Sequence, residues 1–237
     1  MISVGLRRRY YPDDRPDTTE MLYGWIREHV TPASVVLNLG AGPASGVPVK
    51  VLRGEVARLV GADIDPVVTD NDEIDEACVV AEGRLPFADD SFDLVFSDFV
   101  LEHLRSPESF LKEARRVLKS GASFFFRTPS RYHYVCIVAR FTPHRFHEAV
   151  ANRARGFRPG FVKQHPTFYR MNDRRRIARV AREAGFRHVE LRFRESLPAY
   201  LSFHPAVFLA GVAWERVVNR FEALSPLRAN ILGRLLK

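Results

Sequence analysis

Apolar runs alternate with amphipathic segments along the first half of the chain. Short runs rich in valine, leucine and phenylalanine predict buried strands at residues 35–39, 57–63, 77–81, 92–97 and 122–127. Apolar residues at helical spacing predict helices over residues 18–30 and 107–119, with Ser106 as the N-cap and Gly121 as the stop of the second. Strands that alternate with helices predict an α/β fold, in which a mostly parallel sheet carries helices on both faces.

The pattern loosens after Pro129 and becomes regular again further along the chain. Asn172 as N-cap and Gly185 as stop predict a basic helix, and residues 187–195 then alternate like a strand. The predicted division has four parts: a core at 1–130, an inserted cap at 131–171, a return to the core at 172–195, and a helical extension, apolar and basic, at 196–237.

Residues 196–214 contain no Asp, Glu, Lys or Arg. Nineteen uncharged residues come close to the length of a membrane-spanning helix, but Pro198 and Pro205 interrupt the segment. We therefore expect a buried segment or a helix lying on a membrane surface rather than a span. Residues 206–221 would form an amphipathic helix with its arginines on the polar side.

Charge is distributed unevenly behind the net value of +8. Residues 1–127 hold 15 Lys/Arg and 21 Asp/Glu, a formal charge of −6, whereas residues 128–237 hold 21 and 7, a formal charge of +14. The basic half favours an anionic partner, such as an acidic substrate, a nucleic acid or a membrane surface. Cys78 and Cys136 belong to no paired motif, and the first arginines precede no apolar stretch. A cytoplasmic protein without a signal peptide is therefore expected.

A glycine-rich turn, Gly40-Ala41-Gly42, follows the first predicted strand, and the second strand ends in Asp63. Glycines let the backbone approach a ligand closely, and a carboxylate accepts both hydroxyls of a ribose, so the pattern is typical of a nucleoside site. A dinucleotide site usually has a third glycine where this chain has Ser45, which disfavours a cradle for pyrophosphate. The structural alternatives are a tight turn at the glycines and a helix cap at Asp63.

Three further blocks follow in order: Val79-Val80-Ala81-Glu82-Gly83-Arg84-Leu85-Pro86-Phe87, Ser91-Phe92-Asp93-Leu94-Val95-Phe96-Ser97-Asp98 and Leu101-Glu102-His103-Leu104. With the glycine turn, they make the sequence resemble the class I S-adenosylmethionine-dependent methyltransferases, and within them the small-molecule branch that includes ubiquinone-biosynthesis O-methyltransferases. The resemblance covers about residues 30–130. It implies a Rossmann-like methyltransferase sheet, an enzyme, S-adenosylmethionine as cofactor, S-adenosylhomocysteine as product, and no metal.

The resemblance also implies roles for residues at the ends of the strands. The glycine turn would lie against the methionine part of the cofactor, and Asn38, where an acid is usual, would accept a hydrogen bond from the amine. Asp63 would hold the ribose diol. Glu82 would contact the adenine amine unless it is a solvated loop acid, and Gly83 would donate its N–H to the ring. The predicted cofactor-binding residues are Asn38, Gly40, Ala41, Gly42, Asp63, Ile64, Glu82, Gly83 and Asp98.

Methyl transfer acts on an already activated group, so the enzyme mainly aligns the acceptor and removes its proton. His103 follows the fourth predicted strand, at the sheet edge where ligands bind, and is the predicted catalytic base. The alternative is that Glu102 and His103 brace the chain by hydrogen bonds. The predicted substrate contacts are Tyr132, His133, His144, His147 and Tyr169. His144 and His147 lack further ligands, so no metal site is expected.

The favoured hypothesis is a methyltransferase whose acceptor is an oxygen on a small or amphiphilic, partly anionic molecule of lipid-linked, saccharide or quinone type. Its C-terminal segment would bind the inner face of an anionic membrane as a peripheral protein. The +14 half favours RNA as an alternative acceptor, although the chain has no Asn/Asp-Pro-Pro-Tyr/Phe motif for gripping a base amine. A membrane-associated, cofactor-binding module without catalysis is the third hypothesis, and the intact motifs argue against it.

Overall fold

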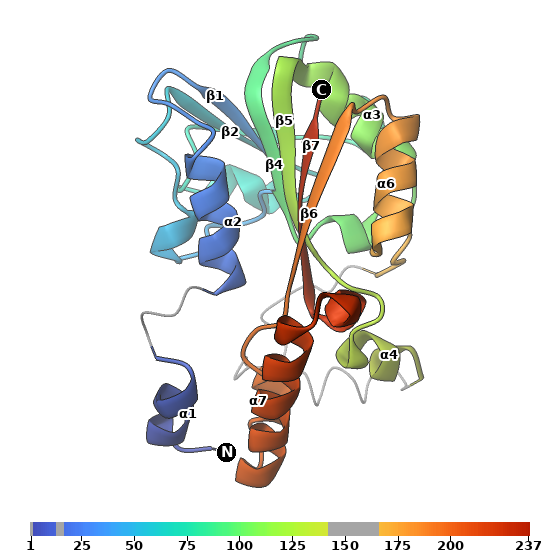
Figure 1. Ribbon diagram of the computed structural model, residues 1–237. Helices are drawn as coiled ribbons and strands as arrows, with labels where there is room; N and C mark the ends of the chain where they lie inside the picture. Colours follow the sequence, from blue (N-terminus) through green and yellow to red (C-terminus); the bar gives the residue numbers. More distant parts are fainter. Residues whose placement is uncertain (1, 13–16, 142–165) are drawn as a thin grey trace. The chain divides into compact units, whose positions relative to one another are not determined.

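The computed structural model describes residues 2–12, 17–141 and 166–237. Within these residues, seven strands form one sheet in the order β3-β2-β1-β4-β5-β7-β6 (Figure 1). The strands are β1 (Val35–Leu39), β2 (Arg58–Asp63), β3 (Glu76–Val79), β4 (Phe92–Asp98), β5 (Leu118–Pro129), β6 (His188–Arg194) and β7 (Asn230–Leu236). The α-helices are α1 (Val4–Tyr10), α2 (Thr18–Arg27), α3 (Pro107–Val117), α4 (Tyr134–Phe141), α6 (Arg174–Glu183) and α7 (Pro205–Arg220). Short 3-10 helices are η1 (Pro48–Lys50), η2 (Pro66–Asp70), η3 (Leu101–His103), η4 (Ala199–Leu201) and η5 (Glu222–Leu227).

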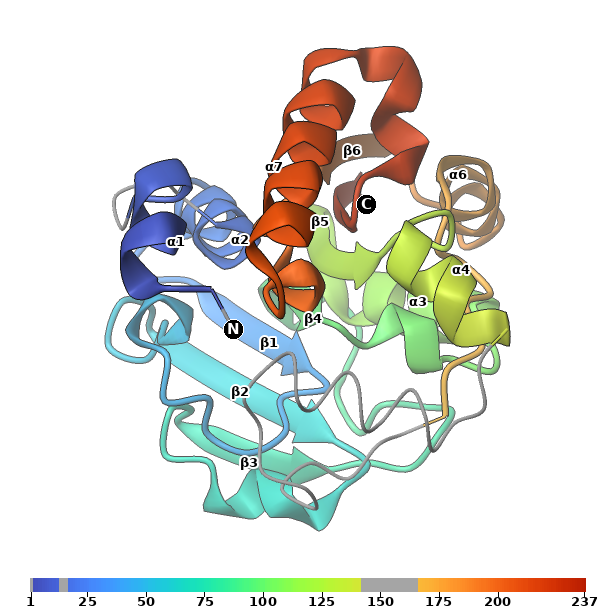
Figure 2. The same cartoon turned by 90° about the horizontal axis from the view of Figure 1, so that it is seen from below.

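The strands β1 to β5 pair in parallel, with β1 between β2 and β4. Parallel pairing places the carboxyl ends of β1, β2, β3 and β4 at one edge of the sheet, and Figure 2 shows β3, β2 and β1 side by side with their arrowheads in the same direction. The predicted parallel α/β sheet is therefore confirmed. All five predicted strands of the first half are present, and β1 has the predicted bounds because its short apolar run is buried in the centre of the sheet.

The chain divides into two compact units. The sheet unit comprises residues 18–128, 167–192 and 231–237, and it holds the glycine turn and most of the strands. The α7 unit comprises the described residues within 1–17, 129–166 and 193–230. The predicted four-part division at residues 130, 171 and 195 stays a prediction.

The predicted helices of the sheet unit are present, with shifted ends. α2 buries Leu22, Trp25 and Ile26 in the core, as the helical spacing predicts. α3 ends two residues early, because Leu118 is already extended and pairs with Phe92 as the first residue of β5. The prediction that Gly121 ends this helix is therefore wrong, since Gly121 lies inside β5 near a register shift.

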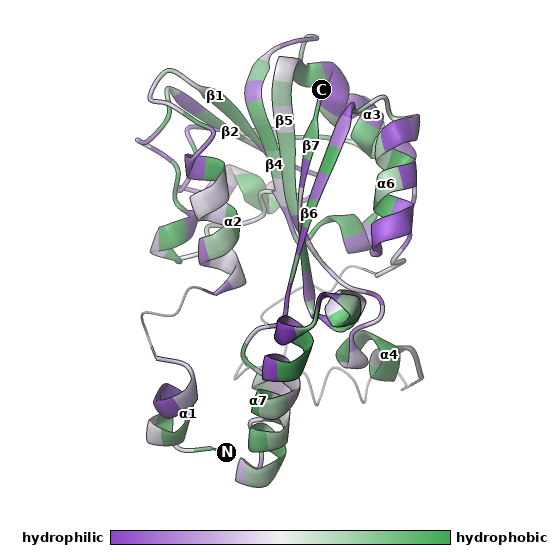
Figure 3. Cartoon of the chain, viewed as in Figure 1, coloured by the Kyte–Doolittle hydropathy of each residue, from purple (hydrophilic) through white to green (hydrophobic). Residues whose placement is uncertain are grey.

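The N-cap predicted for α6 is off by one residue. Asp173 is the cap, and its Oδ1 accepts a hydrogen bond from the Arg176 amide at 2.9 Å. A carboxylate stabilises a helix N-terminus better than an amide does, because it also interacts with the helix dipole. Asn172 is fully buried and donates from Nδ2 to Thr128 Oγ1 at 2.6 Å. Gly185 follows the helix end, as predicted, and the exposed arginines make the outer face of α6 hydrophilic (Figure 3).

Three of the described α-helices and strands, α1, α4 and β7, are not predicted by the sequence pattern. α1 has three consecutive arginines and no buried residue, so it lacks an apolar stripe. β7 is interrupted by Gly233 and Arg234, which hide its strand character. Gly233 is needed there because an added Cβ would overlap the ring of Phe126 in β5. The last residues of the chain therefore belong to the sheet instead of a helical extension.

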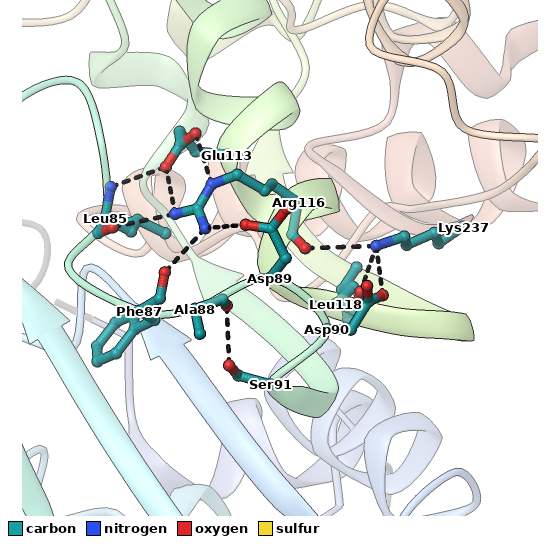
Figure 4. Close-up of polar contacts among 10 residues, drawn as sticks. All are labelled: Leu85, Phe87, Ala88, Asp89, Asp90, Ser91, Glu113, Arg116, Leu118 and Lys237. Carbon is teal, nitrogen blue, oxygen red and sulfur yellow. Dashed lines mark hydrogen bonds and ion pairs between the residues drawn. The ribbon is translucent and has the colours of Figure 1, made fainter.

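Arg116 of α3 fixes the segment between β3 and β4, which carries Glu82 and Gly83 (Figure 4). Its guanidinium donates to the carbonyl oxygens of Leu85 at 3.0 Å and Phe87 at 2.8 Å. At the other end of the segment, Lys237 Nζ pairs with an aspartate carboxylate at 2.8 Å. These contacts hold the loop that borders the sheet edge.

Candidate active site

The turn after β1 is built so that only glycine fits at its first position. Gly40 has φ +80°, and an added Cβ would overlap the side chain of Val100. The amides of Gly40 and Ala41 both donate to the carbonyl oxygen of Ala62, at 2.7 and 3.3 Å. The turn is thus tied to β2 and brings bare backbone to the sheet edge.

Asp63 ties the same turn from the end of β2. Its Oδ2 accepts from the Gly42 amide and its Oδ1 accepts from the Asp65 amide, each at 2.8 Å. Asp65, not Asp63, caps the following helix η2, because its Oδ1 accepts from the Val67 amide at 3.1 Å. Each oxygen of an ionised carboxylate can accept a further hydrogen bond, so Asp63 can brace the turn and still accept from a diol.

A pocket opens where β1 and β4 end. Its lining includes Tyr23, Asn38, Gly40, Ala41, Lys50, Glu73, Phe96 and Asp98. The structure thus brings four of the predicted cofactor residues together: Asn38, Gly40, Ala41 and Asp98. Tyr23, Lys50 and Glu73 belong to none of the sequence motifs and are new. Asn38 lines this pocket, and its Oδ1 is buried without a hydrogen-bond partner among the described residues.

The other predicted cofactor residues lie along the same edge outside this pocket. In the order of the strands, Glu82 and Gly83 follow β3, Asp63 ends β2, Gly40 follows β1 and Asp98 ends β4. Strands about 4.8 Å apart give an edge of about 14 Å from β3 to β4, which suits an extended ligand. Ile64, Glu82 and Gly83 are exposed beside this edge.

Asp98 belongs to a buried ion-pair cluster. Arg127 Nε and Nη2 contact Asp98 Oδ1 and Oδ2 at 2.7 and 2.8 Å, and Lys50 Nζ lies 3.0 Å from Oδ2. Burial alone would raise the pKa of Asp98, but the hydrogen bonds and charge of Arg127, together with Lys50, outweigh it and hold that pKa below its usual range. Arg127 Nη1 also donates to Thr18 and Thr19 of α2.

His103 ends η3, just beyond β4, and its side chain is partly exposed. Its Nε2 lies 3.9 Å from Oε1 of the buried Glu102. Glu102 accepts a hydrogen bond from Thr128 Oγ1 at 2.9 Å through Oε2, and its carbonyl oxygen accepts from the amides of Phe168 and Tyr169. Glu102 therefore braces the chain, as the alternative held for this residue, and leaves His103 as the more accessible of the two.

Comparisons with known proteins agree with this geometry. The methyltransferase domain family matches residues 37–126. The chain is 27% identical over 131 residues to the ubiquinone biosynthesis O-methyltransferase of Stutzerimonas stutzeri; the match covers 49% of this chain and 56% of that protein, so the chain spans little more than half the length of this relative. Similar solved structures include an S-adenosylmethionine-dependent methyltransferase of Archaeoglobus fulgidus (TM-score 0.56, 14% identity, 98% and 97% of the two chains).

A second similar structure is the phosphoethanolamine N-methyltransferase 2 of Haemonchus contortus with phosphomonomethylethanolamine and S-adenosylhomocysteine (TM-score 0.53, 14% identity, 98% of this chain and 56% of that chain). At 14% sequence identity, these two solved structures support the fold alone. Residues 37–126 thus match the methyltransferase domain family, and the predicted Rossmann-like methyltransferase fold is confirmed. The same match supports the predicted enzyme class and cofactor.

The residues at the edge of the methyltransferase domain fit this cofactor. A buried acceptor without a partner is unfavourable, and an amine that donates to Asn38 Oδ1 would satisfy it. Burial also raises the pKa of Tyr23, so its hydroxyl stays protonated beside the pocket. Among the described residues, no group of three or more His, Cys, Asp or Glu is placed to hold a metal ion.

The predicted substrate contacts fall in different parts of the chain. Tyr132 is exposed in the α7 unit, whereas His133 is buried there with Nε2 3.1 Å from Glu195 Oε2, which favours a bracing role. Tyr169 belongs to the sheet unit and is partly exposed, with φ +50°. His144 and His147 lie outside the described residues. The assignment of substrate contacts stays a prediction.

Glu102 gives the methyltransferase domain a pH-dependent stability. Burial, partly offset by the hydrogen bond from Thr128, raises the pKa of Glu102 from 4.5 to about 7. The folded state thus holds this proton more tightly than the unfolded chain, and the stabilisation is complete below pH 4.5 and lost as the pH rises through 7.

We predict that Glu102→Gln, which keeps an acceptor for Thr128, removes this dependence. The free energy of unfolding of the wild type should fall by roughly 2–3 kcal/mol relative to Glu102→Gln between pH 5 and pH 8. Urea unfolding at a series of pH values measures this difference. Exposed Glu28 supplies the control, and a Glu28→Gln variant that follows the wild type is expected. Parallel curves for the wild type and Glu102→Gln would contradict the prediction.

Proposed function

We propose that the protein transfers a methyl group from S-adenosylmethionine to an oxygen of a small amphiphilic acceptor, of lipid-linked, saccharide or quinone type, at an anionic membrane surface. The observation that carries this proposal is the set of exposed apolar side chains along α7 in the α7 unit. The name of the Stutzerimonas stutzeri relative, a ubiquinone biosynthesis O-methyltransferase, is compatible with an oxygen acceptor of quinone type.

α7 exposes apolar side chains instead of burying them all. Leu209, Trp214 and Val217 are exposed along the helix, and Val217 is 46% exposed to solvent. Phe203 before the helix is 64% exposed, and Phe221 after it is 56% exposed. Apolar side chains gathered along one helix are typical of a surface that binds another apolar phase.

The buried side of α7 is the one that carries an acid. Glu215 is fully buried, where it accepts a hydrogen bond from Asn219 Nδ2 at 2.6 Å and from the Tyr11 hydroxyl at 3.4 Å. These hydrogen bonds stabilise the buried Glu215 carboxylate. Leu209, Trp214 and Val217 are exposed on the same helix. The outward side of α7 therefore carries apolar residues beside its arginines, more than the polar side of an ordinary amphipathic helix does.

Arginines adjoin the apolar face. Arg216 and Arg220 are exposed on α7 itself. α1 adds three exposed arginines, and Arg216 Nη2 holds α1 by donating to the Tyr10 carbonyl oxygen at 3.1 Å. Apolar side chains that enter the acyl boundary and arginines that meet phosphate headgroups suit an anionic bilayer. Among the described residues, no helix is both long enough and apolar enough to cross a membrane.

In the proposed reaction, S-adenosylmethionine supplies a methyl group that is already activated by its sulfonium. His103 removes the proton of the acceptor hydroxyl, since it lies beyond β4 at the ligand edge and its side chain is accessible. Glu102 holds the backbone next to it through its contacts with Thr128 and residues 168–169.

RNA is the second candidate acceptor, favoured by one observation. α6 exposes its arginines at positions 174, 175, 176, 179 and 182 on one side of the sheet unit, opposite its buried Ile177 and Val180. Such a face can meet phosphates without reading sequence. The apolar face of α7 has no use in this alternative, so the amphiphilic acceptor is preferred.

The acceptor class is tested by incubating the purified protein with methyl-labelled S-adenosylmethionine and an extract of the native host. We predict that the label partitions into the organic phase and resists nuclease. Label that stays in the aqueous phase and disappears after nuclease treatment would select RNA. Cofactor binding without any labelled product would select a module that lacks catalysis.

In the same assay, His103→Ala should lower turnover about 100-fold or more, because a positioned base contributes that much to proton removal. Its affinity for S-adenosylhomocysteine should stay that of the wild type. His188→Ala, at an exposed position of β6, is the matched control and should turn over normally. Normal turnover by His103→Ala would reject the base assignment without affecting the acceptor class.

Membrane binding is tested by cosedimentation with vesicles. We predict binding to vesicles of phosphatidylglycerol and phosphatidylcholine, weaker binding to phosphatidylcholine alone, and weakening by salt. Val217→Glu should reduce binding about tenfold, because it removes an exposed valine that would enter the membrane and adds a carboxylate. Val79→Glu is the matched control, since Val79 of β3 is 48% exposed but lies in the sheet unit. Equal binding by both variants would contradict the proposal.

A further inference from the structure

Lys50 is the one lysine that lines the pocket at the ends of β1 and β4, and no sequence motif includes it. Its side chain is 26% exposed and its Nζ lies 3.0 Å from Asp98 Oδ2. Arg127 already occupies both oxygens of the same carboxylate, at 2.7 and 2.8 Å. Asp98 therefore has a full counter-ion without Lys50.

The chain around Lys50 is held rigidly in place. Arg27 of α2 donates from Nη1 to the Val49 carbonyl oxygen at 2.9 Å and from Nη2 to that of Val51 at 3.0 Å, one residue on either side of Lys50. Glu55 in turn pairs with Arg27 at 2.8 Å. The backbone on both sides of Lys50 is thus fixed, and Asp98 holds its ammonium at the pocket.

The loop that leads into η1 is fixed as well. Glu73 accepts hydrogen bonds from the amides of Ser45 and Gly46, each at 2.8 Å, and from Ser45 Oγ at 2.9 Å. Glu73 lines the pocket, but its carboxylate oxygens are engaged with this loop. Glu73 thus organises the loop and is a poor candidate for the counter-ion of Lys50.

Arg127 and Lys50 share the carboxylate of Asp98 at this end of the pocket. The other acid in the lining, Glu73, has its oxygens engaged with the backbone amides of Ser45 and Gly46. The position where the family resemblance leads one to expect an acid is Asn38, which is neutral and whose Oδ1 is a buried acceptor without a partner among the described residues. The pocket lining therefore includes a cation that shares its carboxylate with Arg127 and a residue with an unused acceptor.

We propose that Lys50 binds the α-carboxylate of the amino-acid part of S-adenosylmethionine, while Asn38 Oδ1 accepts from its α-ammonium. The α-carboxylate gives Lys50 an anionic partner that it does not share with Arg127, and the α-ammonium gives Asn38 Oδ1 its donor. Lys50 is thereby a specificity residue for ligands that carry an amino-acid group, and Arg127 keeps Asp98 from competing for it. The inference rests on S-adenosylmethionine as the cofactor.

Calorimetric titration of Lys50→Met with two ligands tests the proposal. S-adenosylhomocysteine carries the α-carboxylate, whereas 5′-deoxy-5′-methylthioadenosine has the same nucleoside and sulfur but no amino-acid part. We expect Lys50→Met to weaken S-adenosylhomocysteine at least tenfold and to leave methylthioadenosine unchanged. Lys50→Arg should keep most of the affinity for S-adenosylhomocysteine, because it keeps the charge.

Lys112→Met, at an exposed position of α3, is the matched control and should bind both ligands as the wild type does. Unchanged methylthioadenosine binding also shows that Lys50→Met is folded. Equal weakening of both ligands would show that Lys50 only supports the pocket, and unchanged S-adenosylhomocysteine binding would show that it does not contact the carboxylate. Either result overturns the proposal but leaves the methyltransferase assignment standing, whereas a wild type that binds neither ligand would reject that assignment.

Discussion

The ion pair between Asp98 and Arg127 is the interaction on which the ligand edge of this protein depends. Both residues are buried at the ends of adjacent parallel strands, β4 and β5, and the guanidinium reaches α2 through Thr18 and Thr19. Phe99 lies over the guanidinium, with its ring centre 4.4 Å from Arg127 Cζ. Removing one partner of a buried pair typically costs about 3–5 kcal/mol, because the other charge is left uncompensated. The pair is therefore both a structural tie and the fixed electrostatic feature of the pocket.

The rest of the edge is organised around this fixed point by backbone hydrogen bonds. Asp63 ties the glycine turn to β2, and Gly40 packs against Val100 just beyond β4. The Asp63 carboxylate can still accept hydrogen bonds from a ligand after it has bound the turn. Asn38 Oδ1 likewise has no partner among the described residues and can accept one from a ligand. A methyltransferase needs little more than this, because its cofactor brings an activated methyl group and the protein supplies alignment.

Features carried by local sequence could be predicted, and those that depend on tertiary contacts could not. β1 and the glycine turn were predicted because a short apolar run and a positive φ leave direct marks on the sequence. The place of Lys50 in the pocket could not be predicted, because it depends on contacts with Arg27 and Asp98, which are distant in the chain. The strand β7 could not be predicted because a glycine in a short apolar run resembles the end of a strand. In the sheet, Gly233 is needed to make room for the Phe126 ring. The helix α7 and the exposure of Arg216 and Arg220 were predicted, but its buried acid was not, since the sequence cannot show that Tyr11 and Asn219 make a buried Glu215 tolerable.

The central claim is that the sheet edge from β3 to β4 binds S-adenosylmethionine in an extended form. A crystal structure of the protein with S-adenosylhomocysteine tests it most directly. The account predicts electron density along this edge, with the adenine beside Glu82 and Gly83, the ribose hydroxyls on the Asp63 carboxylate and the amino-acid group in the pocket between Gly40 and Asp98. Density for the ligand away from this edge, or in the reverse direction along it, would contradict the account.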